Sequence, residues 1–218
     1  MAFDAENRLV LNVVCGKRSA SRILELMQKV KGQLNGRVPR LITSDEFSSY
    51  ATVLRLLFQP PPRPVASGQG RKHPPPPKPK QRLNYATVCK RRENGRVVEV
   101  QTRIVLGSKR SVARALKRSR VSNAINTSFL ERHNATDRHR NARKTRRTYR
   151  FSKDWEIHQA VTCFSYYTYN FCWCVRTLRK RLAKRRYQPR TPAMSARLTD
   201  HVWTLEQWLS WPVPGLST

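Results

Sequence analysis

The chain has 218 residues, 39% of them hydrophobic, so it can bury a core and is not expected to be wholly disordered. Its 44 Lys and Arg outnumber 13 Asp and Glu, which gives a net charge of +31. So large an excess predicts a polyanionic partner. The most apolar run, residues 161–175, is too short and too polar to span a bilayer, so nucleic acid is favoured over membrane. The first residues, MAFDAENRL, lack the apolar core of a secretory signal, which predicts a cytoplasmic protein.

Residues 1–58 alternate strand and helix patterns. A β-branched run at residues 8–15 (RLVLNVVC) follows a turn-like segment at residues 4–7, and a second apolar run at residues 39–43 leads into Ser44-Asp45-Glu46. Each strand precedes a helical pattern, the first of them capped by Ser19. This order predicts an α/β layer fold. The apolar positions expected on the two helices are Ile23, Leu26, Met27 and Val30, then Tyr50, Val53, Leu54 and Leu57.

Four further segments follow. Residues 59–81 hold most of the prolines and predict an extended loop. Residues 82–107 alternate apolar and polar residues around Glu93-Asn94-Gly95, which predicts a β-hairpin. Residues 108–186 are basic and mostly helical in pattern, and residues 187–218 predict a Trp-rich tail that packs back on the body.

The five cysteines form no CxxC pair and are odd in number. A zinc ribbon needs four ligands at other spacings, so buried free thiols are the expectation.

Acidic residues are scarce, which makes Asp45 and Glu131 informative. Asp45 follows an apolar strand, and ligands gather at the carboxyl ends of strands in open α/β sheets. A carboxylate there can bind Mg²⁺. Judged by position alone, Asp45 is more simply an N-cap, and Glu131 the last member of a capping box that begins at Ser128.

Four segments together resemble the transposases of the insertion sequence one family: VVCGKRSASRILELM, LITSDEFSSY, NTSFLERHNATDRHRNARK and TYRFSKDWEIHQAV. The resemblance implies a ribonuclease H-like mixed sheet with flanking helices, interrupted by the proline loop and hairpin. It also implies an Asp, Asp, Glu triad that binds two Mg²⁺ ions, or Mn²⁺ in their place, with Asp45 as the second acid and Glu131 as the third. The strand that carries the first Asp is expected before Met1, so the chain is expected to be truncated at its N-terminus. Asp4 stands in a turn one strand too late to replace that acid.

Several basic stretches are expected to neutralise DNA phosphates. The resemblance places a basic residue at Arg138, two turns after Glu131 on the same helix face. For residues 176–186, DNA contact and a solvated helical face are equally expected. The predicted DNA-binding residues are Lys109, Arg110, Arg132, His133, Asn134, Arg138, Arg140, Arg143, Lys144, Arg146 and Arg147.

The aromatic stretch at residues 164–173 has two interpretations. It can stack on unpaired bases, or it can form a helix core. The core is favoured, with an inward face of Val161, Phe164, Thr168, Phe171 and Val175.

These patterns predict a DNA transposase that cleaves and transfers strands with Mg²⁺, and that cuts poorly as this chain alone. Its partners would be element ends and target DNA, with a homodimer on DNA as a family-level expectation. It would lie with the nucleoid in a prokaryotic cytoplasm. The alternative is a non-enzymatic basic nucleic-acid-binding protein, and a weaker third reading makes PPPPKP a ligand for an adaptor domain.

Overall fold

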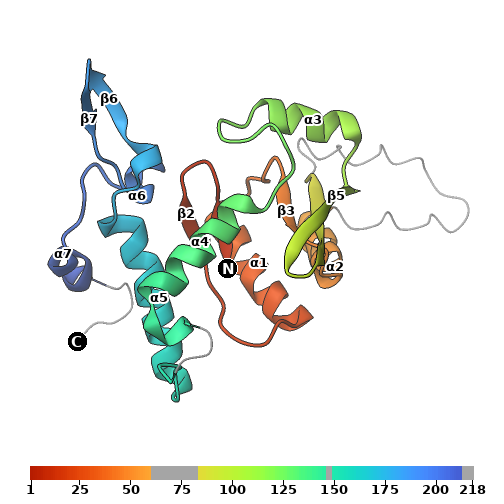
Figure 1. Cartoon of the computed structure of the whole chain (residues 1–218). Helices are drawn as coiled ribbons and strands as arrows, with labels where there is room; N and C mark the ends of the chain where they lie inside the picture. Colours follow the sequence, from red (N-terminus) through yellow and green to blue (C-terminus); the bar gives the residue numbers. More distant parts are fainter. Residues whose placement is uncertain (60–82, 146–148, 213–218) are drawn as a thin grey trace, which may run out of the picture. The chain divides into compact units, whose positions relative to one another are not determined.

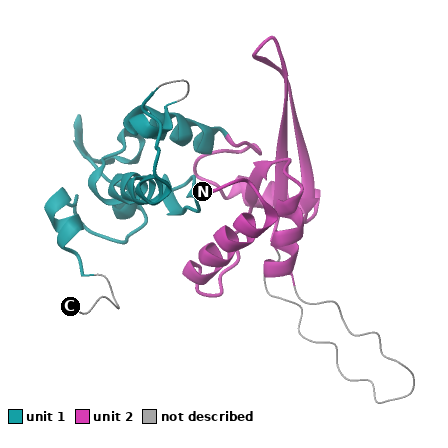
Figure 2. Cartoon of the chain, turned by 90° about the horizontal axis from the view of Figure 1, so that it is seen from below, with its two compact units in different colours: residues 1–15, 128–218 teal, residues 16–127 magenta. Residues whose placement is uncertain are grey.

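A computed structural model of the chain describes residues 1–59, 83–145 and 149–212. The predicted proline loop therefore lies, apart from Gln59, outside the described residues. The chain divides into two compact units, which Figure 2 colours separately. Unit 1 comprises Met1–Cys15 and Ser128–Thr218, and unit 2 comprises Gly16–Thr127. This division follows contacts between distant segments.

Unit 2 contains a three-stranded mixed sheet in the order β3-β4-β5. Strand β3 (Ile42–Asp45) runs parallel to β4 (Tyr85–Glu93), and β4 is antiparallel to β5 (Arg96–Leu106). The predicted hairpin is confirmed: Asn94 and Gly95 both have positive φ, the backbone that a tight two-residue hairpin turn requires. The chain is thus a mixed α/β protein, as expected, with helices flanking this sheet (Figure 1).

Helices α1 (Ala20–Gln33) and α2 (Ser49–Phe58) pack together in unit 2. Ser19 caps α1 by accepting a hydrogen bond from the Arg22 amide, as predicted. All four predicted apolar positions of α1 are buried. On α2, Val53 and Leu54 are buried, whereas Tyr50 and Leu57 are only partly covered.

A buried asparagine joins the sheet of unit 2 to α3 (Lys109–Lys117). The Asn84 side chain donates to the Arg40 carbonyl at 2.7 Å and accepts from the Ser111 hydroxyl at 2.6 Å. Gly107 follows β5 with φ +93°, and a Cβ there would lie 2.2 Å from the Asn84 side-chain oxygen. Only glycine therefore fits between the strand and the helix.

Unit 1 begins with a hairpin of β1 (Ala2–Asp4) and β2 (Leu9–Asn12). Asp4 closes the turn by accepting from the amides of Glu6 and Asn7, consistent with its predicted position in a turn. Among the described residues β2 pairs only with β1.

The remaining helices of unit 1 are α4 (Ser128–Arg140), α5 (Trp155–Cys172), α6 (Pro192–Ser195) and α7 (Leu205–Ser210). The Asn170 side chain on α5 bonds both the amide and the carbonyl of Val10 on β2, at 2.9 and 2.8 Å. The buried face of α5 carries Thr162, Tyr166 and Asn170, not the predicted apolar stripe, and Phe164 is exposed. None of the described helices is both long and apolar enough to cross a membrane.

The C-terminal part of unit 1 differs from expectation in one respect and agrees in another. Residues 176–186 were expected to be helical, but apart from the single 3₁₀ turn Arg176–Leu178 they enter a hairpin of β6 (Lys180–Ala183) and β7 (Arg186–Gln188). The tail packs back as predicted: the Trp203 ring packs against Phe171 at a tilt, and Trp208 meets Phe164 edge-on. Buried Ala193 and Met194 anchor α6.

Candidate nucleic-acid interface

Asp45 is the last residue of β3, at the carboxyl end of the strand. Its carboxylate pairs with Arg18, whose guanidinium also lies 4.4 Å from the centre of the Phe47 ring. Both charged side chains are about half exposed, so the pair contributes little to stability, roughly 0–1 kcal/mol. Asp45 is not a helix cap: Ser48 precedes α2 and makes no side-chain capping bond.

Glu131 lies in the first turn of α4 and is exposed. Ser128 is the first helical residue, so Thr127 stands at the cap position that the sequence assigned to Ser128. Glu131 belongs to unit 1 and Asp45 to unit 2. The two predicted metal ligands are therefore carried by different compact units.

The predicted DNA-binding residues of α4 fall into an exposed and a covered set. Arg132, Arg138 and Arg140 are exposed, as are Arg143 beyond the helix and Lys109 and Arg110 on α3. Asn134 is half-buried, and His133 and Lys144 are largely covered. Arg146 and Arg147 lie outside the described residues.

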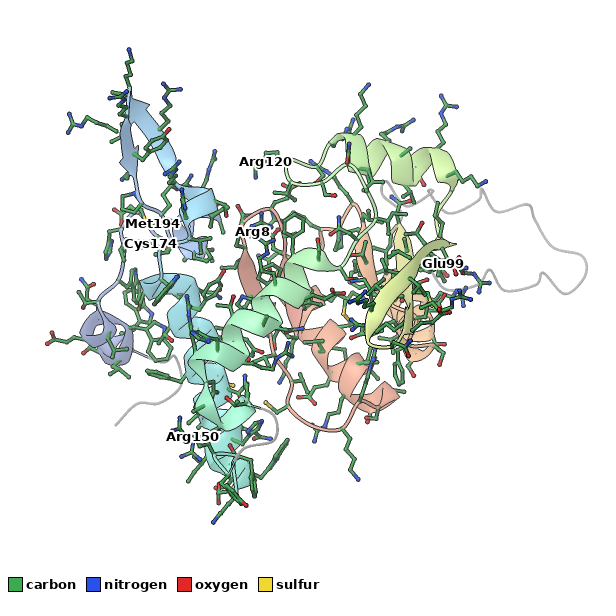
Figure 3. All side chains as sticks on the ribbon, viewed as in Figure 1. Arg8, Glu99, Arg120, Arg150, Cys174 and Met194 are labelled. Carbon is green, nitrogen blue, oxygen red and sulfur yellow. The ribbon has the colours of Figure 1, made fainter. Side chains whose placement is uncertain are left out.

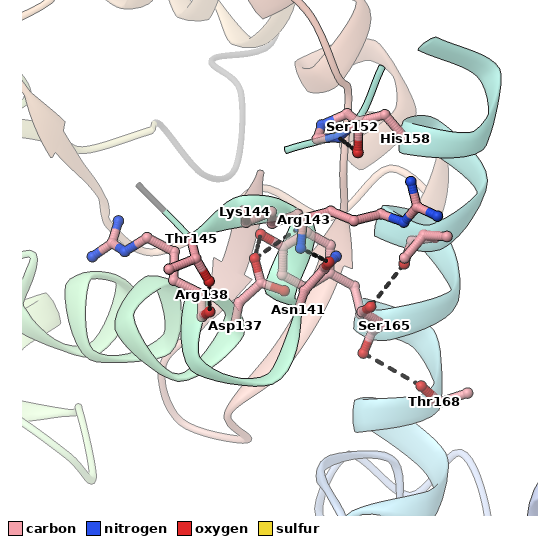
Figure 4. Close-up of polar contacts among 12 residues, drawn as sticks. Asp137, Arg138, Asn141, Arg143, Lys144, Thr145, Ser152, His158, Ser165 and Thr168 are labelled. Carbon is pink, nitrogen blue, oxygen red and sulfur yellow. Dashed lines mark hydrogen bonds and ion pairs between the residues drawn. The ribbon is translucent and has the colours of Figure 1, made fainter. Parts of the chain in front are cut away.

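A buried ion pair fixes the end of α4. Lys144 donates to the Asp137 carboxylate at 2.7 Å (Figure 4). The same carboxylate oxygen accepts from the Tyr166 hydroxyl at 2.9 Å. Asp137 also contributes its carbonyl to the Asn141 amide at 2.8 Å. Burial and the Asp137 charge raise the pKa of Tyr166 far above its usual range, so the phenol remains a donor. Lys144 is thus committed to Asp137 and is not an exposed phosphate contact.

His133 lies beside this pair, between aromatic rings. It stacks on Phe3 at 4.9 Å and lies 4.6 Å from the Tyr169 ring. Only 6% of the residue is exposed. Burial lowers the pKa of His133 to about 4, although the nearby Asp137 charge acts in the opposite direction. The imidazole is therefore neutral at pH 7 and cannot serve as a cationic phosphate contact.

Sequence reasoning did not single out Asp137 or Tyr166. The sequence does contain a signal for Asp137, because it is one of only 13 acids and follows His133 by one helical turn. Lys144, which pairs with Asp137, lies beyond the end of α4, so helical spacing in the sequence does not identify it as the partner.

Four arginines surround a hollow of about 1250 Å³ in unit 2. Arg37 and Arg40 come from the segment before β3, and Arg114 and Arg118 come from α3 and its C-terminal end. All four are exposed. Guanidinium groups suit phosphate oxygens because their planar donors can bond two oxygens at once.

Cationic side chains also project from α3 and from the β6–β7 hairpin (Figure 3). Every residue of both hairpin strands is exposed, including Lys180, Arg181 and Arg186. Both units therefore present positive charge to solvent.

The cysteines are free thiols, four of them half-buried and Cys174 exposed, so they are less covered than expected. Within the described ranges no three His, Cys, Asp or Glu side chains gather closely enough to hold a metal ion.

Comparison of the chain with protein-family models, with curated proteins and with solved structures finds no match in any of the three.

Proposed function

We propose that the protein is a DNA transposase of the magnesium-dependent, ribonuclease H-like class. Its exposed cations hold the DNA backbone, and Asp45 and Glu131 are its metal-binding carboxylates. The observation that carries the enzymatic part is the position of Asp45, a solvent-accessible carboxylate at the carboxyl end of β3 that does not cap a helix.

The exposed arginines support DNA as the substrate. DNA carries one negative charge per roughly 1.7 Å of helix axis, and cationic side chains that replace its counterions gain affinity without reading sequence. Arg37, Arg40, Arg114 and Arg118 are placed to do this in unit 2. In unit 1, Arg132 and Arg138 on α4 lie near Glu131 in sequence and are also exposed.

The carboxylates suit the proposed metal by their donor chemistry. Mg²⁺ prefers carboxylate oxygens and keeps several positions for water and phosphate oxygen, and both Asp45 and Glu131 are accessible to solvent. When bound, the metal would activate a water or a 3′-hydroxyl and stabilise the leaving oxygen of an in-line displacement. The residues of the chain position the phosphate, with Arg138 two helical turns after Glu131.

A non-enzymatic nucleic-acid-binding protein is the second candidate. It is favoured by the ion pair that Asp45 makes with Arg18 and by the location of the two acids in different units. This candidate keeps every phosphate contact and assigns Asp45 a structural role.

Metal-directed cleavage of the protein separates the two candidates. Fe²⁺ supplied to the DNA-bound chain in place of Mg²⁺, together with hydrogen peroxide and ascorbate, generates hydroxyl radicals that cut the polypeptide near the bound ion. We expect cuts near both residue 45 and residue 131, suppressed by excess Mg²⁺ and lost at both places in Asp45→Asn. The matched control is Asp200→Asn, since Asp200 is an exposed acid paired with His201. Cuts at only one of the two places, cuts at residue 131 that survive Asp45→Asn, or no cuts at all would contradict the proposed metal binding and favour the second candidate.

A further inference from the structure

A cavity of about 200 Å³ lies between α4 and α5, within unit 1. It is several times larger than the roughly 30 Å³ that one water occupies, and smaller than the ~300 Å³ at which pockets for drug-sized ligands begin. Its size suits one planar ring system. The side chains that bear on its chemistry are His133, Asp137 and Arg140 from α4 and Tyr166, Tyr169 and Trp173 from α5 and its end.

The walls of this cavity offer flat stacking surfaces. The Arg140 guanidinium lies 3.4 Å from the centre of the Trp173 ring and 5.7 Å from that of Tyr169. Trp173 is half exposed, so its ring is accessible from solvent. Aromatic rings and guanidinium planes are the groups on which proteins stack unpaired bases.

A buried polar atom is left without a partner at the same cavity. His133 lines it, and the His133 Nε2 atom is fully covered and has no hydrogen-bond partner in the part of the chain that the structure describes. Buried polar atoms are rarely left unsatisfied in folded proteins. A neutral imidazole nitrogen can pair with a donor or an acceptor according to its tautomer, and the polar edge of a base offers both.

Other small occupants fit less well. An isolated phosphate would meet the Asp137 carboxylate along with Arg140, since both line the cavity. An apolar ligand would leave the His133 nitrogen unpaired. A planar ring with polar edges, joined to a negatively charged backbone, matches the aromatic walls, the imidazole and Arg140 together.

We propose that this cavity receives one unpaired nucleobase of bound DNA, stacked beside Trp173, with His133 in the wall of the cavity. The inference rests on the DNA binding of the proposed function but not on metal binding or strand cleavage. It makes Trp173 a binding residue for single-stranded ends or flipped nucleotides.

The test compares three duplexes: one fully paired, one with a one-base overhang, and one with the same overhang lacking its base. We expect the full chain to bind the overhang more tightly than its abasic counterpart and to quench 2-aminopurine placed there. Trp173→Ala should reduce that preference by roughly fivefold to a hundredfold, the range expected for loss of one base–aromatic stack, while Trp173→Phe should retain most of it. Affinity for the fully paired duplex should stay unchanged.

Trp155→Ala is the matched control, because Trp155 starts the same helix, is 49% exposed against 50% for Trp173, and lies outside the cavity. It should leave the preference intact. Equal affinity of the native chain for base-bearing and abasic overhangs would overturn the inference, as would a preference that survives Trp173→Ala. Overhang preference without any binding of the paired duplex would support the cavity and contradict the backbone contacts proposed above.

Discussion

Asp137 holds a lysine and a tyrosine in the interior of unit 1, with its side chain 6% exposed and that of Lys144 14% exposed. Asp137→Asn removes the counter-charge and leaves the ammonium group covered. Breaking a buried pair in this way typically costs about 3 kcal/mol or more. We therefore expect a loss of about that size in the free energy of unfolding, measured by urea denaturation.

Glu25→Gln is the control for that substitution. Glu25 pairs with Arg22 and Lys29 on the exposed surface of α1, where solvent screens such pairs and they contribute little to stability. If both substitutions cost the same, the Asp137–Lys144 pair is not buried as described.

His133 predicts a pH dependence of stability. Its folded-state pKa is lowered to about 4, below the ordinary 6.5, because burial disfavours the charged ring. As the pH falls from 6.5 towards 4, the unfolded chain binds a proton at this residue and the folded chain does not. Stability should therefore fall with decreasing pH across that window, by at most about 1.4 kcal/mol per pH unit.

His133→Phe keeps an aromatic ring and removes the titrating group. Denaturation of both proteins between pH 7 and pH 4 should show a shallower decline for the variant. A native chain that becomes more stable as pH falls through this range would contradict the neutral, buried imidazole.

Single residues were predictable where the signal is local. The position of Asp45 after an apolar run and the capping by Ser19 follow from neighbours within a few residues, and both are seen. The covered state of His133 was not predictable, because the residues that cover it, Phe3 and Tyr169, come from distant parts of the sequence.

At the scale of the elements, the Asn170 side chain on α5 makes two hydrogen bonds to the Val10 backbone of β2, as a neighbouring strand would. Asn170→Leu would leave the Val10 amide and carbonyl buried without partners, at a cost of about 1–3 kcal/mol for each group. We expect a stability loss of about 2–6 kcal/mol, with hydrogen exchange of the Val10 amide strongly accelerated. Thr168→Val on the same helix is the control, since its hydroxyl only supplements the Phe164 carbonyl. Unchanged protection at Val10 would show that Asn170 does not tie β2 to α5.

Helices and strands were predicted correctly where the sequence contains a regular apolar spacing or a specific turn motif. Apolar spacing placed α1, and the Asn94-Gly95 turn placed the β4–β5 hairpin. The same reasoning assigned a helix to residues 176–186, whose Lys and Arg are compatible with either conformation, and the strands there pair through a turn with Arg185 at positive φ. The inward face of α5 was misassigned because its buried positions, Thr162 and Asn170, are polar.

At the scale of the whole chain, unit 2 is one continuous segment, and unit 1 consists of the segments that precede and follow it. Contacts such as Asn170 with Val10, 160 residues apart, create this division. Local periodicity contains no such pairing, so the unit boundaries could not be predicted. The net charge could be predicted, because it is a sum over residues that needs no fold, and +31 follows from composition. Both units have exposed arginines, such as Arg132 in unit 1 and Arg114 in unit 2.

DNA affinity as a function of salt tests the binding of the phosphate backbone most directly. If at least about six phosphates are neutralised, the affinity for a duplex should fall roughly a thousandfold between 50 and 200 mM salt and differ little between sequences. A fall of less than about tenfold over that range, or affinity confined to one sequence at all salt concentrations, would contradict binding through the exposed cations.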